Sequence, residues 1–233
     1  MKIIKIDYKN PDPKIIKKVA EAIQKGGLAI VPGDAVYTLV GDATNIESIR
    51  KIQKVKRRER KKAFNLGLYK LSDIVKYGKF NPLIYKIQEA FPDEPFTFVV
   101  SRKKGILPAF LNPDYEGLGF RVPFNKVTSM LSKFNRTPVI GTSANLSGLG
   151  NTYSIKELMD YFSGVFDRGV RPDIILDAGE LPERKPSTVI EISDKEIKII
   201  REGDIERALL EKEIKKLTEK LIKQEEKDED FRH

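Results

Sequence analysis

The 233-residue chain contains no cysteine, and its single histidine, His233, is the last residue. Without cysteine the chain cannot form disulfides, thiolate nucleophiles, iron–sulfur clusters or cysteine-ligated zinc sites. A terminal residue frays, so His233 cannot hold an imidazole in a fixed geometry. This argues against histidine-based acid–base catalysis, Ser-His triads and histidine-ligated metal sites. The chemistry that remains is chemistry by positioning and by fixed charge.

The sequence also lacks a signal peptide and any apolar run near 18 residues, which argues against secretion and against a membrane span. We therefore expect a cytoplasmic protein. Hydrophobic residues make up 40% of the chain and charged residues 33%, so the chain can bury a core. Its length corresponds to one large domain or two small ones. We expect one domain over residues 1–205, followed by a C-terminal tail over 206–233.

Positive charge is concentrated in one segment. Lysine and arginine total 43 against 34 aspartates and glutamates, a net charge of +9. Residues 50–62 carry nine positive charges and one negative charge, or +8. Such a cluster predicts an anionic partner such as a nucleotide, RNA or phosphate. The alternative is a solvated, lysine-rich surface of the kind found in heat-adapted proteins.

Short apolar runs alternate with segments of helical periodicity. A helix begins after Asp12, with Pro13 in its first turn, and ends before Gly26. Further helices are expected at 45–55, 82–90, 124–133 and 154–162, and strands at 3–6, 28–31, 64–68, 96–100, 118–122, 138–141, 173–176, 187–192 and 196–200. This mixture predicts an α/β protein with one twisted, mixed sheet. The last two strands flank residues 193–195 and are expected to form a hairpin.

From about residue 204 the composition changes to an amphipathic helix with an acidic end. We expect this helix to dock on its own domain; the alternative is a helix for a partner protein.

Three loops contain small, hydroxylated or glycine residues next to an expected strand. They are residues 142–148, 186–188 and 201–204. Such turns can surround a phosphate or carboxylate with hydroxyl and amide groups. The alternative is an ordinary Ser/Asn turn that satisfies its own backbone. The chain has no G-x-x-x-x-G-K-[ST] run and no G-x-G-x-x-G after a strand, so neither a P-loop nor a dinucleotide-binding unit is supported.

The order of several motifs resembles the YrdC/YciO family, whose best-understood members are threonylcarbamoyl-AMP synthases. The resemblance covers residues 10–205 and includes PGDAVYTL at 32–39, KRR at 56–58, FP at 91–92, PFT at 95–97, GFRVP at 119–123, SANLSG at 143–148, PSTV at 186–189 and REG at 201–203. The segment 64–74 and the REGD ending are closer to the YciO branch.

The resemblance implies a YrdC-like α/β fold with a large basic cavity. It also implies that threonine and bicarbonate form N-carboxythreonine, which reacts with ATP to give threonylcarbamoyl-AMP and pyrophosphate, the precursor of the N6-threonylcarbamoyl mark on adenosine 37 of tRNA. Mg²⁺ would arrive with ATP, and no protein-bound metal and no covalent intermediate are expected. The implied partners are ATP, L-threonine, bicarbonate, tRNA or double-stranded RNA, and other tRNA-modification proteins.

The same resemblance implies roles for individual residues. Contacts to ATP and its phosphates fall on Lys56, Arg58, Lys62, Ser143, Asn145, Ser187 and Arg201, whereas contacts to the amino acid or carboxylate fall on Arg121, Ala35 and Gly141. An arginine can clamp a carboxylate with two parallel hydrogen bonds, which a lysine cannot. Asp34 and Tyr37 could take part in the site. They could equally well serve only to cap a turn and to pack in the core.

Departures from the family pattern bear on the substrate. Ala35 stands where the family has a threonine, and Gly33 and Thr38 replace the family's threonine and glycine. Gly67 stands near the place of a histidine, Gly117 replaces a threonine, and Asn151 replaces a serine. Losing hydrogen-bonding groups alters a threonine pocket, because each contact contributes on the order of 1 kcal/mol. Two alternatives therefore stay open: adenylation of another small carboxylate, or a module that binds double-stranded RNA or tRNA without synthase activity.

Overall fold

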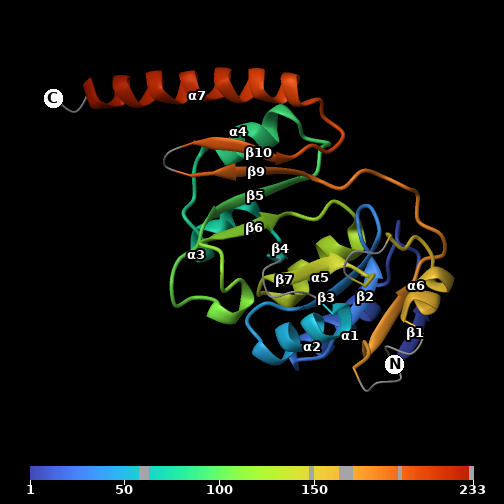
Figure 1. Ribbon diagram of the computed structural model, residues 1–233. Coiled ribbons are helices and arrows are strands. Elements are labelled where there is room, and N and C mark those ends of the chain that lie inside the picture. The colour runs from blue at the N-terminus through green and yellow to red at the C-terminus, as the bar shows by residue number, and fades with distance from the viewer. Residues whose placement is uncertain (58–62, 147–149, 163–169, 194–195, 231–233) are drawn as a thin grey trace.

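The computed structural model describes residues 1–57, 63–146, 150–162, 170–193 and 196–230. Within this part of the chain, ten strands form one mixed sheet in the order β1-β8-β2-β3-β7-β4-β6-β5-β9-β10 (Figure 1). The expected α/β class with a mixed sheet is confirmed. The strands are β1 Lys2–Lys5, β2 Ala29–Pro32, β3 Tyr37–Asp42, β4 Asn65–Gly67, β5 Phe96–Ser101, β6 Gly117–Arg121, β7 Val139–Ser143, β8 Ile174–Asp177, β9 Thr188–Ile192 and β10 Ile197–Arg201.

The described helices are α1 Pro13–Gln24, α2 Ile46–Lys56, α3 Ile74–Tyr77, α4 Leu83–Ala90, α5 Lys126–Asn135, α6 Ile155–Phe162 and α7 Arg207–Asp230, with 3-10 turns at Leu71–Asp73 and Ala109–Leu111. Polar side chains cap the helices that matter most for the site. Asn45 accepts a hydrogen bond from the Glu47 amide at 2.9 Å at the start of α2, and Asn125 accepts one from the Thr128 amide at 2.9 Å at the start of α5. These caps fix where each helix begins.

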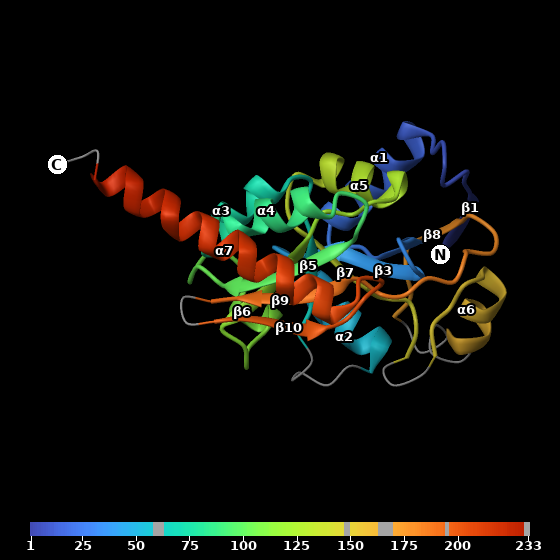
Figure 2. The ribbon, with the colours of Figure 1, turned by 90° about the horizontal axis from the view of Figure 1, so that it is seen from above.

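Two groups of buried side chains cover the two faces of the sheet. On β3, Leu39 belongs to the buried cluster that includes side chains of α2, α4 and α7, whereas the neighbouring Val40 belongs to the cluster with side chains of α1 and α5. Successive side chains of a strand point to opposite faces, so α2 and α5 lie on opposite sides of β3 and β7 (Figure 2). The β7 strand pairs with β3 and with β4, which in turn pairs with β6. This sequence of neighbours brings the ends of β3, β7, β4 and β6 together under α5.

The C-terminal helix α7 docks on its own domain, as the sequence predicts. Leu210 is fully buried in the larger core cluster and Ile214 is nearly so. Helix α7 runs beside α4, and its last turns extend beyond the sheet (Figure 1). The helix is therefore anchored by its first half. No helix of the described residues is long and apolar enough to span a membrane.

The structure adds elements that the periodicity did not reveal. The strand β3 was not expected; it runs antiparallel to β2 after the tight turn at 33–36. Five of its six residues are buried, so it lacks the alternation of a half-exposed strand. The short helix α3 was also missed. The expected hairpin is confirmed, because β9 and β10 pair antiparallel.

Candidate functional site

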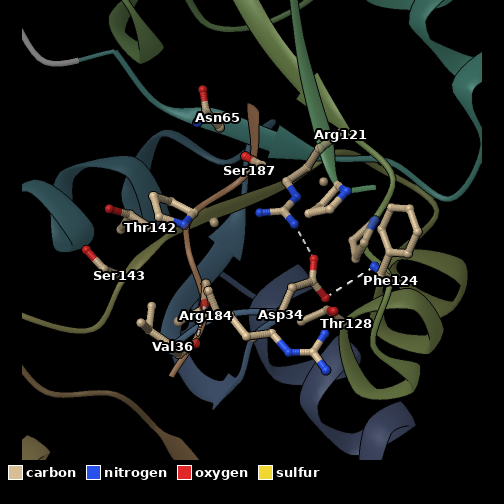
Figure 3. A pocket seen from close by; sticks show the side chains of 18 of the residues that line it. Asp34, Val36, Asn65, Arg121, Phe124, Thr128, Thr142, Ser143, Arg184 and Ser187 are labelled. Atoms are coloured by element: carbon tan, nitrogen blue, oxygen red, sulfur yellow. Dashed lines mark hydrogen bonds and ion pairs between the residues drawn. The ribbon is translucent and has the colours of Figure 1, made fainter. Parts of the chain in front are cut away.

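A cavity of about 1130 Å³ lies over the face of β3, β7 and β4 on which α5 packs, beside the end of β6 (Figure 3). Its walls come from segments that are far apart in the sequence. They are the β2–β3 turn, the β3, β4, β6 and β7 strands, one side of α5, the segments 93–95 and 183–187, and the residues Arg201 and Asp204. A hollow of this size, with polar groups from several elements, has the general form of a small-molecule site.

Arg121 ends β6 and points into this cavity, where its Nη2 forms an ion pair with Asp34 (Figure 3). The other carboxylate oxygen of Asp34 accepts hydrogen bonds from the backbone amides of Phe124 at 3.2 Å and Asn125 at 2.8 Å. Asp34 thus fastens the β2–β3 turn to the segment before α5. The Nε atom of Arg121 is buried and has no acceptor among the described residues. The guanidinium therefore keeps donor capacity for a further anion.

Arg201 lies at the end of β10 and holds the segment around Ser187. Its Nε and Nη2 donate to the Ser187 carbonyl at 3.0 and 2.8 Å, and Nη2 donates to the Ser187 hydroxyl at 3.2 Å. That hydroxyl also shares a 2.9 Å hydrogen bond with Thr97. Partial burial lowers the pKa of Arg201, with a smaller contribution from the positive charge of Arg121. Both arginine residues line the same cavity.

Lys56 lies outside the cavity lining, beneath the turn that follows β7. Its side chain is 1% exposed, and Nζ donates to the Ser143 carbonyl at 2.5 Å, the Asn145 carbonyl at 2.8 Å and the Asn145 Oδ1 at 2.9 Å. The Ser143 hydroxyl donates to the same Oδ1 at 2.7 Å. Lys56 and Asn145 hold the turn together, whereas Ser143 lines the cavity. Contact of Lys56 or Asn145 with a phosphate stays a prediction.

The residues expected around the amino acid converge on the cavity. Arg121, Ala35 and Gly141 all line it, as do Ser143, Ser187 and Arg201 from the expected phosphate group. Arg58 and Lys62 lie outside the described residues. The structure thus brings six of the expected residues around one hollow and leaves Lys56 and Asn145 behind its wall.

The charges on the described lining are of both signs. The basic residues are Arg121, Arg184, Lys185 and Arg201, and the acidic residues are Asp34, Asp93, Glu94, Glu183 and Asp204. These residues do not give the cavity the net positive charge that the resemblance implies. On this part of the lining, positive charge comes from Arg121 and Arg201 and from the neighbouring pair Arg184-Lys185. Among the described residues no group of three acidic or histidine side chains could hold a metal ion.

The sequence left the roles of Tyr37 and Asp34 open, and the structure places the two side chains in different surroundings. Tyr37 is fully buried; its hydroxyl donates to the Gly179 carbonyl at 2.8 Å and accepts from the Ala178 amide at 2.9 Å. Burial raises the pKa of Tyr37 to about 12. It packs in the core, whereas Asp34 faces the cavity. A Cβ at Gly33 would collide with Oγ1 of Thr38 and with the carbonyl oxygen of Val36, so this turn requires glycine at position 33.

Sequence reasoning missed several lining residues, among them Asn65, Ser132 and Arg184. Asn65 pairs with Gly119 and Gly141, so the absence of side chains beside it exposes its amide. The basic pair Arg184-Lys185, directly before Pro186, was a visible signal. Ser132 offers no signal, since one serine in an amphipathic helix is unremarkable in sequence.

Comparison with known proteins gives the same family as the motifs. Residues 21–203 match the family model Sua5_yciO_yrdC, described as "Telomere recombination". A protein of Methanocaldococcus jannaschii named "Putative threonylcarbamoyl-AMP synthase" is 34% identical over 210 residues, which cover 88% of this chain and 94% of that protein.

Two solved structures are similar in fold. The crystal structure of E. coli YciO has a TM-score of 0.75 and 25% identity, covering 88% of this chain and 98% of that chain. The structure of P. abyssi Sua5 complexed with L-threonine has a TM-score of 0.80 and 22% identity. That match covers 92% of this chain but only 61% of the Sua5 chain, so the present chain corresponds to part of Sua5.

Proposed function

The chain belongs to the Sua5/YciO/YrdC family, and we propose that it is a threonylcarbamoyl-AMP synthase-like nucleotidyltransferase. Its substrates would be ATP, bicarbonate and L-threonine, with Mg²⁺ bound to the nucleotide. Two comparisons support this: the name of the M. jannaschii relative and the threonine in the P. abyssi Sua5 structure. The product, a mixed anhydride of a carbamate and AMP, would serve in the N6-threonylcarbamoylation of adenosine 37 in tRNA.

The proposed reaction proceeds in two stages. The threonine nitrogen first attacks bicarbonate to give N-carboxythreonine, with loss of water. An oxygen of the new carboxylate then forms a bond to the α-phosphorus of ATP while the bond from that phosphorus to the bridging oxygen of the β-phosphate breaks. Pyrophosphate leaves with the electron pair of that bond. No protein nucleophile takes part, in keeping with a chain that has no cysteine and one terminal histidine.

The single observation that carries the proposal is the state of Arg121. Its guanidinium faces a cavity of about 1130 Å³, pairs through one nitrogen with Asp34, and has a buried Nε without an acceptor among the described residues. A buried donor without a partner costs about 1–3 kcal/mol. Apart from the ion pair with Asp34, the terminal nitrogens make no hydrogen bond to a described residue, so a substrate carboxylate in the cavity would bind this planar guanidinium.

The nucleotide would bind to a second group of polar side chains in the cavity. The Ser143 and Ser187 hydroxyls and the Arg201 guanidinium face the same cavity and can hydrogen-bond phosphate oxygens. Fixed positive charge at Arg121 and Arg201 would stabilise the charge that develops on the phosphates as pyrophosphate departs. Holding both reactants in one hollow converts a bimolecular step into an effectively unimolecular one. Positioning and charge thus account for the proposed catalysis.

The test is ATP-dependent pyrophosphate release with threonine and bicarbonate, compared between the native protein and Arg121→Lys. The substitution keeps the positive charge but removes the planar guanidinium group with its parallel N–H donors. We expect the KM for threonine to rise about 10- to 100-fold, the effect of losing about 1.5–3 kcal/mol of charge-assisted hydrogen bonding, while the KM for ATP stays within about twofold.

Arg102→Lys is the matched control, because Arg102 is a partly buried arginine outside the cavity lining. It should leave both KM values unchanged. Native protein without threonine-dependent pyrophosphate release would contradict the proposal, and equal effects of the two arginine substitutions would contradict the role of Arg121.

A further inference from the structure

The hydroxyl group of Ser132, on the cavity side of α5, has no hydrogen-bond partner in the described part of the chain. Its residue is 4% exposed and lines the cavity, yet its side chain makes no hydrogen bond to any described residue. A serine inside a helix commonly donates to the carbonyl four residues earlier, which Ser132 does not do. Thr128, one turn earlier on the same side of α5, is satisfied by the Asn125 side chain at 3.0 Å. The Ser132 hydroxyl therefore faces the cavity with donor and acceptor capacity that no described residue uses.

The space in front of Ser132 exists because residue 67 is glycine. Gly67 pairs with Arg121 on one side and with Val139 on the other, so all three residues face the cavity in one row across the sheet. A Cβ built at Gly67 would lie 3.4 Å from the Ser132 hydroxyl and 3.6 Å from Pro123 Cγ. The missing side chain therefore leaves room between Arg121 and Val139 that leads directly to Ser132.

The walls of this space determine what could fill it. Leu131 and Val139 are buried, line the cavity and present apolar surface beside Gly67 and Ser132. Thr128, which Figure 3 shows beside Asp34, marks the same side of α5. A charged group would be poorly solvated between these apolar walls. A small neutral group with a hydroxyl would satisfy Ser132 and leave its carbon atoms against Leu131 and Val139.

We propose that the space above Gly67 is a side-chain subsite, and that Ser132 is its specificity-determining residue for a small α-amino acid that carries a hydroxyl group. The inference rests on the proposed function, since it takes the carboxylate of the same molecule to be bound by Arg121. It assigns the choice of hydroxylated substrate to helix α5. Neighbouring strands lie about 4.8 Å apart, so one small amino acid spans the distance between β6, which carries Arg121, and β4, which carries Gly67.

The test compares L-threonine with L-2-aminobutyrate, which lacks the hydroxyl, in the native protein and in Ser132→Ala. Affinities are measured by calorimetry in the presence and absence of ATP, and kcat/KM by pyrophosphate release. We expect the native protein to prefer threonine about tenfold and Ser132→Ala to reduce this preference to about twofold. Ser129→Ala, a partly buried serine of α5 outside the cavity lining, is the matched control and should keep the native preference.

Thermal unfolding distinguishes a binding role from a structural one. Since the Ser132 hydroxyl has no partner, Ser132→Ala should leave Tm unchanged or raise it. The second variant, Gly67→Ala, introduces a Cβ at ordinary contact distances and should fold normally. It should weaken threonine binding at least tenfold while glycine binding changes less than threefold, because glycine has no side chain to displace.

An unchanged preference for threonine in Ser132→Ala, or equal losses for threonine and glycine in Gly67→Ala, would overturn the subsite and leave the proposed function standing. Binding that follows the expected pattern without pyrophosphate release would support the subsite and contradict the synthase reaction. A native protein that binds neither amino acid would overturn both.

Discussion

Among single residues, Lys56 illustrates how a cation can belong to a site without facing it. Its motif position implies a phosphate contact, yet its ammonium group is buried under three oxygen atoms of residues 143 and 145. Such a cation fixes the backbone that carries the Ser143 hydroxyl into the cavity. Sequence could identify Lys56 as important but could not assign this role, because the acceptors lie about 90 residues away along the chain.

Lys56→Met should destabilise the protein by about 3 kcal/mol, because hydrogen bonds to charged groups contribute about 1.5–3 kcal/mol and the buried acceptors would stay unpaired. Urea unfolding followed by circular dichroism measures this change. Lys54→Met, at an exposed position of the same helix, is the control and should change stability by less than about 0.5 kcal/mol. Equal small effects of both substitutions would contradict the structural role of Lys56.

Tyr37 should make the stability depend on pH in the alkaline range. Its pKa is about 12 in the folded protein and about 10 when exposed, so the unfolded chain loses this proton first as pH rises. Stability from this residue is complete below pH 10 and is lost between about pH 10 and 12, at about 1.4 kcal/mol per pH unit.

Tyr37→Phe lacks this titration and leaves the Gly179 carbonyl and Ala178 amide without their partner, at a cost of about 1–3 kcal/mol at neutral pH. The difference in unfolding free energy between the native and substituted proteins should therefore shrink from pH 9 to pH 11. If plots of unfolding free energy against pH stay parallel for the two proteins over this range, the folded protein does not hold the phenol in its neutral form.

At the scale of elements, capped and amphipathic helices were the most predictable features. Asp12 with Pro13 marks the start of α1, and the periodicity at 45–55 predicts α2 to within one residue at each end. Strand β3 escaped prediction because it is buried on both faces and carries no alternation. The subsite beside Gly67 was equally hidden, because it depends on β4 lying between β6 and β7. Local patterns specify elements, whereas this neighbourhood is specified by long-range pairing.

The C-terminal helix should contribute to the stability of the whole domain. Leu210 is fully buried in the main core cluster, so Leu210→Ala should cost about 2–5 kcal/mol. Ile222→Ala, at a half-exposed position of the same helix, should cost less than about 0.5 kcal/mol. Both are measured by urea unfolding monitored at the helix signal. If α7 of the Leu210→Ala variant unfolds in a separate transition at low urea concentration while the stability of the domain is unchanged, the helix does not contribute to the stability of the domain.

At the scale of the whole molecule, the fold gathers groups that the sequence separates. Asp34, Arg121, Ser143, Ser187 and Arg201 come from different elements and line one cavity. The motif order predicted that Arg121, Ser143, Ser187 and Arg201 lie together, and these motifs fall within residues 21–203, which match the family model. The charge balance was harder to anticipate, because Asp93, Glu94 and Asp204 reach the lining from loops whose positions depend on tertiary packing. Among the described lining residues, acidic and basic side chains are therefore both present, and Arg121 and Arg201 are two of the four basic ones.

The central claim is that one hollow holds a carboxylate at Arg121 and a nucleotide at the wall formed by Ser143, Ser187 and Arg201. A crystal structure with L-threonine and a non-hydrolysable ATP analogue tests it most directly. We expect the threonine carboxylate on the Arg121 guanidinium, the side chain above Gly67, and phosphate oxygens within hydrogen-bond distance of Ser143, Ser187 or Arg201. Ligands bound elsewhere on the surface, with the cavity empty at saturating concentrations, would contradict the account.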